Sequence, residues 1–363
     1  MATIHTLTYY VIPLALILGL LIIFHEFGHF IVAKFFGVKV LRFSVGLGPK
    51  LIGKRFGETE YAISVIPFGG YVKMLGEGPD EEPVPVWEEH RAFNNQPVLK
   101  RVAIVAAGPI FNLILALFIF IFFYMIVGEK VLLPEVGGVK KGSAAESAGI
   151  RAGDLIIAVD DIPIKKWDQI KEIVKSKGCI PLVLTIRREN KIQKIVIVPK
   201  IGKVRNMFGE EIQTPVLGII ASGRTRLIKF SLLGAIKEGA IRSWEIIKLT
   251  CITVVKLIKR IVPIKTLGGP ILIGQITGKI AQQDWRYLIP FTAILSINLG
   301  ILNLLPIPIL DGGLIVMLLL ELAIRRPLDQ KIQETAHKVG LIILICLMAM
   351  VMYNDITRIL TNR

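Results

Sequence analysis

Two histidines four residues apart, with a glutamate beside the first, form the segment best suited to chemistry, His25-Glu26-Phe27-Gly28-His29. Residues at i and i+4 lie on one face of a helix, so both imidazoles can bind a single metal ion. An adjacent glutamate can then act as general base toward a water molecule. The alternative is a chance match with packed histidines, but three ionisable groups in an apolar segment are costly unless they serve a function.

The segment that carries these residues is apolar all round. Residues 11–24 precede the motif and residues 30–33 follow it with only hydrophobic side chains and glycine or proline. A soluble helix would show a polar face, so we predict a membrane span over roughly residues 7–36. A signal peptide is the alternative, but the segment has neither a basic n-region nor a cleavage motif.

Composition places the chain among integral membrane proteins. It has 363 residues, of which 53% are hydrophobic, and its mean hydropathy is +0.63. The net charge of +16 comes from basic residues beside apolar segments. That pattern favours contact with anionic lipid and topology signalling, and it disfavours nucleic acid as a partner. Cys179, Cys251 and Cys346 are scattered and form no metal or disulfide pattern.

Further apolar tracts predict more spans. One covers roughly residues 102–127 and another roughly 338–354, while the tract Tyr287–Ala323 is too long for one ordinary span and is broken by prolines. Basic residues between the first two spans predict that this loop is cytoplasmic and the N-terminus is outside. Residues 227–262 mix basic and apolar residues, which predicts an interfacial helix, with an extra pair of spans as the alternative.

The sequence of the segment after the first span predicts β-structure. Residues 38–73 read as short strands separated by glycines, apolar enough to associate with the membrane. An ordinary cytoplasmic hairpin is one interpretation. The other is an edge strand containing Gly69, Gly70 and Tyr71, which would bind an unwound peptide by β-augmentation.

A soluble domain follows the second span, on the outer side. Residues 142–150 and about 167–176 predict helices, and residues 154–159, 182–187 and 194–198 predict strands. The run from Arg151 to Asp160 resembles the signature of PDZ domains, which bind peptides at a sheet edge. We take Val136, Gly137, Gly138 and Val139 as the candidate binding loop, and a steric gate without bound peptide as the alternative.

A third metal ligand is needed for a catalytic site with an open position. Asp311 follows Pro306 and Pro308 in a broken apolar tract, where a carboxylate can point inward from an unwound helix at the depth of the histidines. A simple helix cap is the alternative. Pro109 and Asn112 in the second span indicate either a kink with a packed asparagine or a catalytic amide.

Taken together, these motifs resemble the site-2 protease family, in particular its bacterial branch that includes the regulator of sigma-E protease. The resemblance rests on His25–His29, Gly108–Asn112, the PDZ-like domain and Asn298–Gly313 in that order, although the best-known proteobacterial members carry two PDZ domains and this chain has one. It implies zinc on His25, His29 and Asp311, with Glu26 as general base. It also implies that Asn112 stabilises the tetrahedral intermediate, and that Asn298 and Asn303 engage the substrate backbone.

The resemblance further implies regulated intramembrane proteolysis of single-span proteins, such as an anti-sigma factor, or of remnant signal peptides in a bacterial inner membrane. We expect an α-helical polytopic membrane protein of about four transmembrane helices, with a membrane-associated β-loop and one inserted extracytoplasmic PDZ domain (α+β). The expected divisions are residues 1–127, 128–205, 206–280 and 281–363. A silent peptide-binding scaffold and a metal transporter are the competing functions, and zinc is preferred over other divalent ions.

Overall fold

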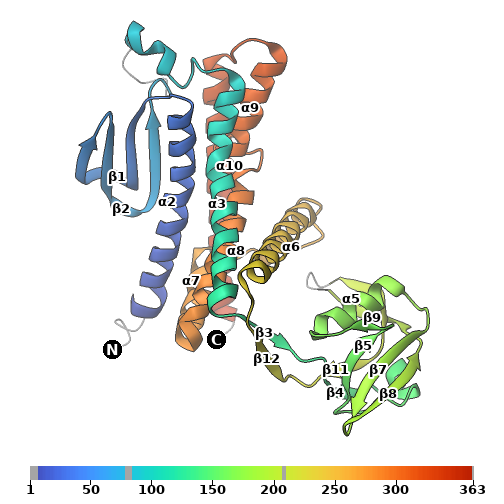
Figure 1. Ribbon diagram of the computed structural model, residues 1–363. Coiled ribbons are helices and arrows are strands. Elements are labelled where there is room, and N and C mark those ends of the chain that lie inside the picture. The colour runs from blue at the N-terminus through green and yellow to red at the C-terminus, as the bar shows by residue number, and fades with distance from the viewer. Residues whose placement is uncertain (1–6, 78–83, 207–209, 362–363) are drawn as a thin grey trace. The chain divides into compact units, whose positions relative to one another are not determined.

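The computed structural model describes residues 7–77, 84–206 and 210–361 (Figure 1). The chain divides into two compact units, Met1–Phe123 with Leu233–Arg363, and Tyr124–Leu232. The second unit is therefore inserted into the first, as expected. It is longer than the predicted residues 128–205, because two strands after residue 216 return to pair with its first two strands. That long-range pairing leaves no mark in the local sequence pattern.

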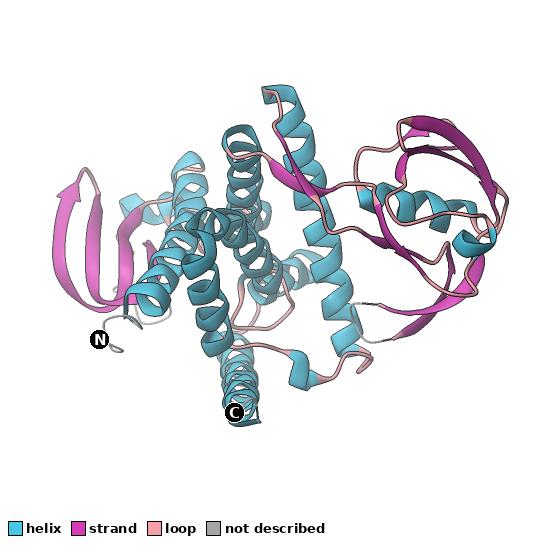
Figure 2. Cartoon of the chain, turned by 90° about the horizontal axis from the view of Figure 1, so that it is seen from below, coloured by secondary structure: helices cyan, strands magenta, loops and turns pink. Residues whose placement is uncertain are grey.

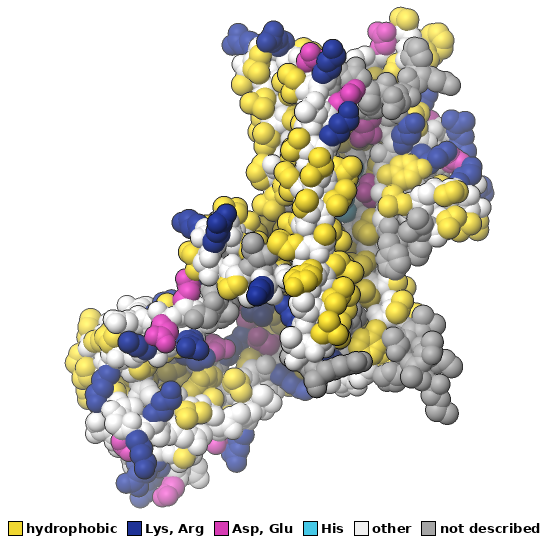
Figure 3. Space-filling model, turned by 180° about the vertical axis from the view of Figure 1, so that it is seen from behind, with side chains coloured by type: hydrophobic (Ala, Val, Ile, Leu, Met, Phe, Trp, Pro, Cys, Tyr) yellow, Lys and Arg dark blue, Asp and Glu magenta, His cyan; other side chains and the backbone are white. Residues whose placement is uncertain are grey.

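The first unit contains four helices that are long and apolar enough to cross a membrane, counted over the described residues: Thr8–Phe35, Val98–Ile126, Pro270–Asn303 and Lys331–Thr361. Their helices are α2 (Ile12–Phe35), α3 (Val98–Ile126), α7 (Pro270–Asp284) with α8 (Leu288–Asn303), and α10 (Gln330–Thr361). Figure 2 shows these helices from below, and Figure 3 shows the apolar side chains along their length. A helix satisfies its own backbone polar groups, which is what a lipid environment requires. The prediction of a polytopic membrane protein is confirmed.

Helix α7 was not predicted, because residues 206–280 were assigned to an interfacial helix and a connector. Proline at its first position suits a helix start. The carboxylate of Asp355, from α10, accepts hydrogen bonds of 3.0 Å from the backbone N–H groups of Gly269 and Leu272. A cap supplied from a distant part of the chain is not visible in the sequence around residue 270.

Helix α6 (Leu232–Ile258) covers most of the predicted interfacial segment. It begins later than residue 227, because Thr225–Ile228 forms strand β12. Among the described residues, α6 does not belong to the set of helices apolar enough to span a membrane. One helix therefore covers this segment where an extra pair of spans would need two, and its interfacial position stays a prediction.

The long apolar tract breaks where its prolines predicted. Helix α8 ends at Asn303, and α9 (Asp311–Ile324) begins at Asp311. A Cβ on Gly312 would lie 2.3 Å from the carbonyl of Leu304, and one on Gly313 would lie 2.2 Å from the carbonyl oxygen of Ile307. Glycine at both positions lets the turn fold back closely on α9 and sets Asp311 at the first position of the helix.

Strands β1 (Val40–Phe56) and β2 (Thr59–Met74) form a bent antiparallel sheet beside α2 (Figure 1). Residues 42–45 pair with residues 60–63 on one side and with residues 70–73 on the other. The bend thus makes a four-segment sheet in which residues 70–74 form one edge. This edge segment belongs to β2, which packs against α2. The predicted hairpin is present, with an edge strand on the side of the histidine helix.

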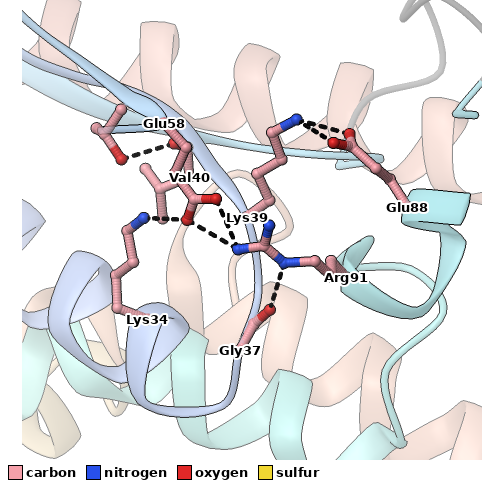
Figure 4. A network of polar contacts seen from close by, with 8 residues as sticks. Lys34, Gly37, Lys39, Val40, Glu58, Glu88 and Arg91 are labelled. Atoms are coloured by element: carbon pink, nitrogen blue, oxygen red, sulfur yellow. Dashed lines mark hydrogen bonds and ion pairs between the residues drawn. The ribbon is translucent and has the colours of Figure 1, made fainter. Parts of the chain in front are cut away.

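A polar network fixes this sheet to the end of α2 (Figure 4). Lys34 of α2 pairs with Glu58 in the β1–β2 turn, and Arg91 of the short helix η2 (Val86–Arg91) donates to the same carboxylate at 2.8 Å. Partial burial raises the pKa of Glu58, but Lys34 and Arg91 outweigh it and hold the pKa below its ordinary value. The carboxylate therefore stays ionised and paired at neutral pH.

The inserted unit is built around a four-stranded antiparallel sheet. Its order is β6-β5-β7-β8, and Ile156, Leu182 and Ile186 are fully buried in its core. The elements are β3 (Glu129–Leu132), β4 (Val136–Val139), α4 (Ala144–Ser147), β5 (Leu155–Val159), β6 (Ile162–Pro163), α5 (Trp167–Lys177), β7 (Leu182–Arg188), β8 (Lys191–Ile197), β9 (Lys200–Arg205), β10 (Glu211–Val216), β11 (Ile219–Ala221) and β12. The predicted helices and strands of this domain are all present.

Helices α3 and α9 are joined by a buried ion pair. Arg101 donates to Glu321 at 2.7 Å, and the side chains are 12% and 6% exposed. The second carboxylate oxygen accepts from the backbone N–H of Leu328 at 3.2 Å. Since α9 carries Asp311, this pair helps to fix its position relative to α3.

We expect Glu321→Ala to destabilise the protein by about 3–5 kcal/mol, because it leaves the Arg101 guanidinium buried without its partner. Thermal unfolding in detergent measures the effect as a lower Tm. The control is Glu245→Ala, which removes a pair with Arg242 whose side chains are about half exposed and should change the Tm little. Equal Tm values for the two variants would show that the buried pair contributes nothing.

Candidate metal centre

The structure brings the three predicted ligands together. Nε2 of His25 lies 3.3 Å from Nε2 of His29 and 3.1 Å from a carboxylate oxygen of Asp311. Nε2 of His29 lies 3.6 Å from the other oxygen of Asp311. The i, i+4 spacing places both imidazoles on one face of α2, and the start of α9 supplies the carboxylate.

These separations fit a zinc ion. Ligand atoms about 2.1 Å from a tetrahedral zinc lie about 3.4 Å from one another, and the three measured separations are 3.1, 3.3 and 3.6 Å. Two imidazoles and one carboxylate are a donor set that zinc accepts, and three protein ligands leave a fourth position open. Among the described residues the donor set thus matches that of catalytic zinc sites, whereas structural zinc sites are closed by a fourth residue.

Glycines make room for the imidazoles between α2 and α3. A Cβ on Gly108 would lie 2.3 Å from Nε2 of His29 and 2.9 Å from Cε1 of His25. A Cβ on Gly28 would lie 2.5 Å from the carbonyl oxygen of Ala107. The two helices therefore pack closely through glycine on each side, and the histidine side chains occupy the space that a side chain at residue 108 would fill.

The remaining ring nitrogens of the histidines both face α3. Nδ1 of His29 lies 2.9 Å from the carbonyl oxygen of Ile104, and Nδ1 of His25 lies 3.2 Å from the side-chain amide of Asn112. Asn112 is fully buried. The structure thus places Asn112 behind a ligand, on the side of the imidazole away from Asp311.

The side chain of Glu26 extends from the histidine helix α2 toward the edge of the sheet. The backbone N–H of Val72 in β2 faces its carboxylate. A Cβ on Gly70 would lie 3.1 Å from Cγ of Glu26. The predicted substrate-binding residues Gly69, Gly70 and Tyr71 therefore lie on the strand that touches the predicted base.

The two asparagines predicted to engage substrate are separated. Asn303 lies at the site, with its amide nitrogen 3.3 Å from Nε2 of His25. Asn298 does not, because its side-chain oxygen accepts a hydrogen bond of 2.7 Å from Thr250 of α6. Five residues along a helix turn the direction of a side chain by about 140°, so the two cannot face the same site from one regular helix.

The prediction that Val136–Val139 form a PDZ binding loop is wrong. These residues form strand β4, which pairs with β11, and the N–H of Val136 donates to the carbonyl of Asp154 at 2.8 Å. Their backbone is thus used inside the domain. Among the described strands, β11 pairs with β4 alone, so its other edge pairs with no described strand. Strand β11 was not predicted, because residues after 205 were expected to form a connector. The apolar run Val216–Ala221, interrupted only by Gly218, was the available signal.

Comparisons with known proteins agree over nearly the whole chain. The sequence model described as Peptidase family M50 matches residues 13–347. A Campylobacter jejuni protein named "Putative zinc metalloprotease Cj1068" is 40% identical over 350 residues, covering 95% of this chain and 92% of that protein. A similarly named protein of Agrobacterium fabrum is 33% identical over 377 residues and 99% of each chain. One of Vibrio cholerae is 30% identical over 444 residues, covering 94% of this chain and 97% of that one.

Solved structures of PDZ domains are among the matches, each covering 24% of this chain. The PDZ domain of the SdrC-like protein from Listeria monocytogenes is 23% identical, covers 24% of this chain and 84% of that chain, and has a TM-score of 0.20.

We expect Gly108→Ala to weaken zinc binding by at least about 10-fold, because the added methyl group must displace both imidazoles. Zinc bound by the purified protein, measured by mass spectrometry after titration with a chelator, checks this. Gly19→Ala, also on a membrane helix, is the matched control, since its Cβ would meet nothing within 4 Å. Wild-type zinc affinity in Gly108→Ala would contradict the placement of α3 against the histidines.

Proposed function

The chain belongs to peptidase family M50, and we propose that this zinc metalloprotease cuts peptide bonds within the membrane-spanning segments of single-span membrane proteins. Intramembrane proteolysis is the general activity of the family. The observation that supports the narrower proposal is the position of the site. His25, Glu26 and His29 lie within a candidate membrane span, beside an edge strand that can bind an extended peptide.

We assign the zinc ligands to His25, His29 and Asp311, whose donor atoms lie within 4.8 Å of one another. When bound, zinc would polarise the substrate carbonyl and make a water molecule more acidic. Glu26 would take the proton of that water on its carboxylate and pass it to the nitrogen of the leaving amine. The backbone N–H of Val72 faces this carboxylate, which would orient the base before substrate arrives.

Binding of a membrane helix requires that it be locally unwound, since its peptide groups are otherwise hydrogen-bonded within the helix. The edge of β2 at Gly69, Gly70 and Tyr71 would supply replacement backbone hydrogen bonds. Asn303 would engage the substrate backbone at the site, 3.3 Å from the His25 imidazole. Asn298 is bonded to Thr250, so a role in substrate binding would require it to give up that contact.

The proposed location is a bacterial inner membrane, with the inserted domain on the outer side. Basic residues are concentrated between α2 and α3, which supports a cytoplasmic position for the β-sheet. The inserted domain follows α3 and so would lie on the opposite side. There it would exclude or recruit substrates such as anti-sigma factors and remnant signal peptides.

The test is cleavage of a reporter transmembrane peptide in detergent, measured together with bound zinc. We expect Glu26→Gln to lower the cleavage rate by at least about 100-fold while zinc stays bound, because the base is lost and the ligands remain. Asp311→Asn should lose both zinc and cleavage. Equal cleavage by wild type and both variants would exclude the site, and zinc binding without cleavage of any transmembrane peptide would favour a scaffold.

A further inference from the structure

The side-chain oxygen of Asn112 is a buried acceptor without a hydrogen-bond donor among the described residues. The side chain as a whole is fully buried, and its Nδ2 lies 3.2 Å from Nδ1 of His25. A buried amide oxygen without a donor costs about 1–3 kcal/mol, so this arrangement needs an explanation.

The orientation of the His25 ring supplies the missing donor. Nε2 of His25 faces Asp311 at 3.1 Å and the His29 ring at 3.3 Å, so Nε2 is the atom available to a metal ion. A neutral imidazole that ligates through Nε2 carries its proton on Nδ1. That N–H points at Asn112 and needs an acceptor there, whereas Nδ2 is a donor.

A half-turn of the amide group gives the ring proton of His25 an acceptor, and Nδ2 then takes the buried position that Oδ1 leaves. The oxygen and nitrogen of an asparagine amide are similar in size, and which end points where is decided by hydrogen bonding. Exchanging the two ends places Oδ1 next to Nδ1 of His25, where it accepts the ring proton. The orphaned acceptor and the unmatched donor then satisfy each other.

We propose that Asn112 is a positioning residue for the zinc site, whose Oδ1 accepts a hydrogen bond from Nδ1–H of His25 and so presents Nε2 to the metal. This role of Asn112 rests on the proposed function only in taking zinc as the bound metal ion. It differs from the oxyanion-stabilising role that the family resemblance implies for Asn112, because it acts on a ligand and needs no substrate.

The surroundings of Asn112 fit a fixed orienting group. Ser296 of α8 donates a 2.7 Å hydrogen bond to the backbone carbonyl of Asn112, and a Cβ on Gly300 would lie 3.4 Å from the Cβ of Asn112. His29 is held in the same way, since its Nδ1 lies 2.9 Å from the carbonyl of Ile104. One helix, α3, thus supplies an acceptor to each of the two histidine ligands.

The test measures zinc affinity without catalysis, by chelator competition in the Glu26→Gln background. Asn112→Leu keeps the side-chain volume but removes the acceptor, and we expect its zinc affinity to fall about 10–100-fold, as for other partners of metal-bound histidines. Asn112→Asp keeps an oxygen acceptor and should bind zinc at or above the starting affinity. Asn298→Leu is the matched control, because the side-chain oxygen of Asn298 accepts its hydrogen bond from Thr250 of α6.

Folding is checked by the Tm of each variant in excess chelator, where the zinc contribution is absent. Unchanged zinc affinity in Asn112→Leu, together with lost cleavage when Glu26 is restored, would overturn the proposal in favour of the oxyanion role. Equal loss of affinity in Asn112→Leu and Asn112→Asp would also overturn it, since only an acceptor requirement separates the two. Failure of the wild type to cleave any peptide would reject the proposed function and leave this comparison valid.

Discussion

Ionisable side chains at membrane depth must find partners within the protein, and the rest of this structure depends on how that requirement is met. His25, Glu26, His29 and Asp311 cannot rely on water for their hydrogen bonds in an apolar segment. Each has a protein partner: the Ile104 carbonyl, the Asn112 amide, the Val72 N–H, or another member of the group. The metal site is therefore built by the packing of α3 and β2 onto α2 as much as by its ligands.

The β-sheet contributes to the same arrangement from the other side. A glycine at residue 70 lets the strand approach the base closely, and the ion pairs of Glu58 and Arg91 fix the far end of the sheet to α2. The sheet that carries the edge strand is thus held against α2 at two separate places. The edge proposed to receive substrate therefore lies next to Glu26.

The sequence predicted those features that are encoded locally. Helical spacing gave the histidine pair, the hydrophobic length gave the first span, and Pro306 with Pro308 gave the break before Asp311. The features it did not predict depend on distant partners. The start of α7 is capped by Asp355. Strands β11 and β12 pair with strands about 80 to 100 residues earlier in the chain, and Asn298 turns toward Thr250. Val136–Val139 has the glycines of a loop, yet the pairing with β11 makes it a strand.

Several of the most constrained positions in this protein have no side chain at all. At Gly28, Gly108, Gly312 and Gly313, even a methyl group would come within 3 Å of a backbone carbonyl or an imidazole. Random mutagenesis scored only by loss of activity would rank these four positions with His25 and Asp311, although none of them donates, accepts or transfers anything. Tolerance to substitution in this enzyme therefore maps the closeness of its helices, and chemistry has to be assigned by measuring metal and rate separately.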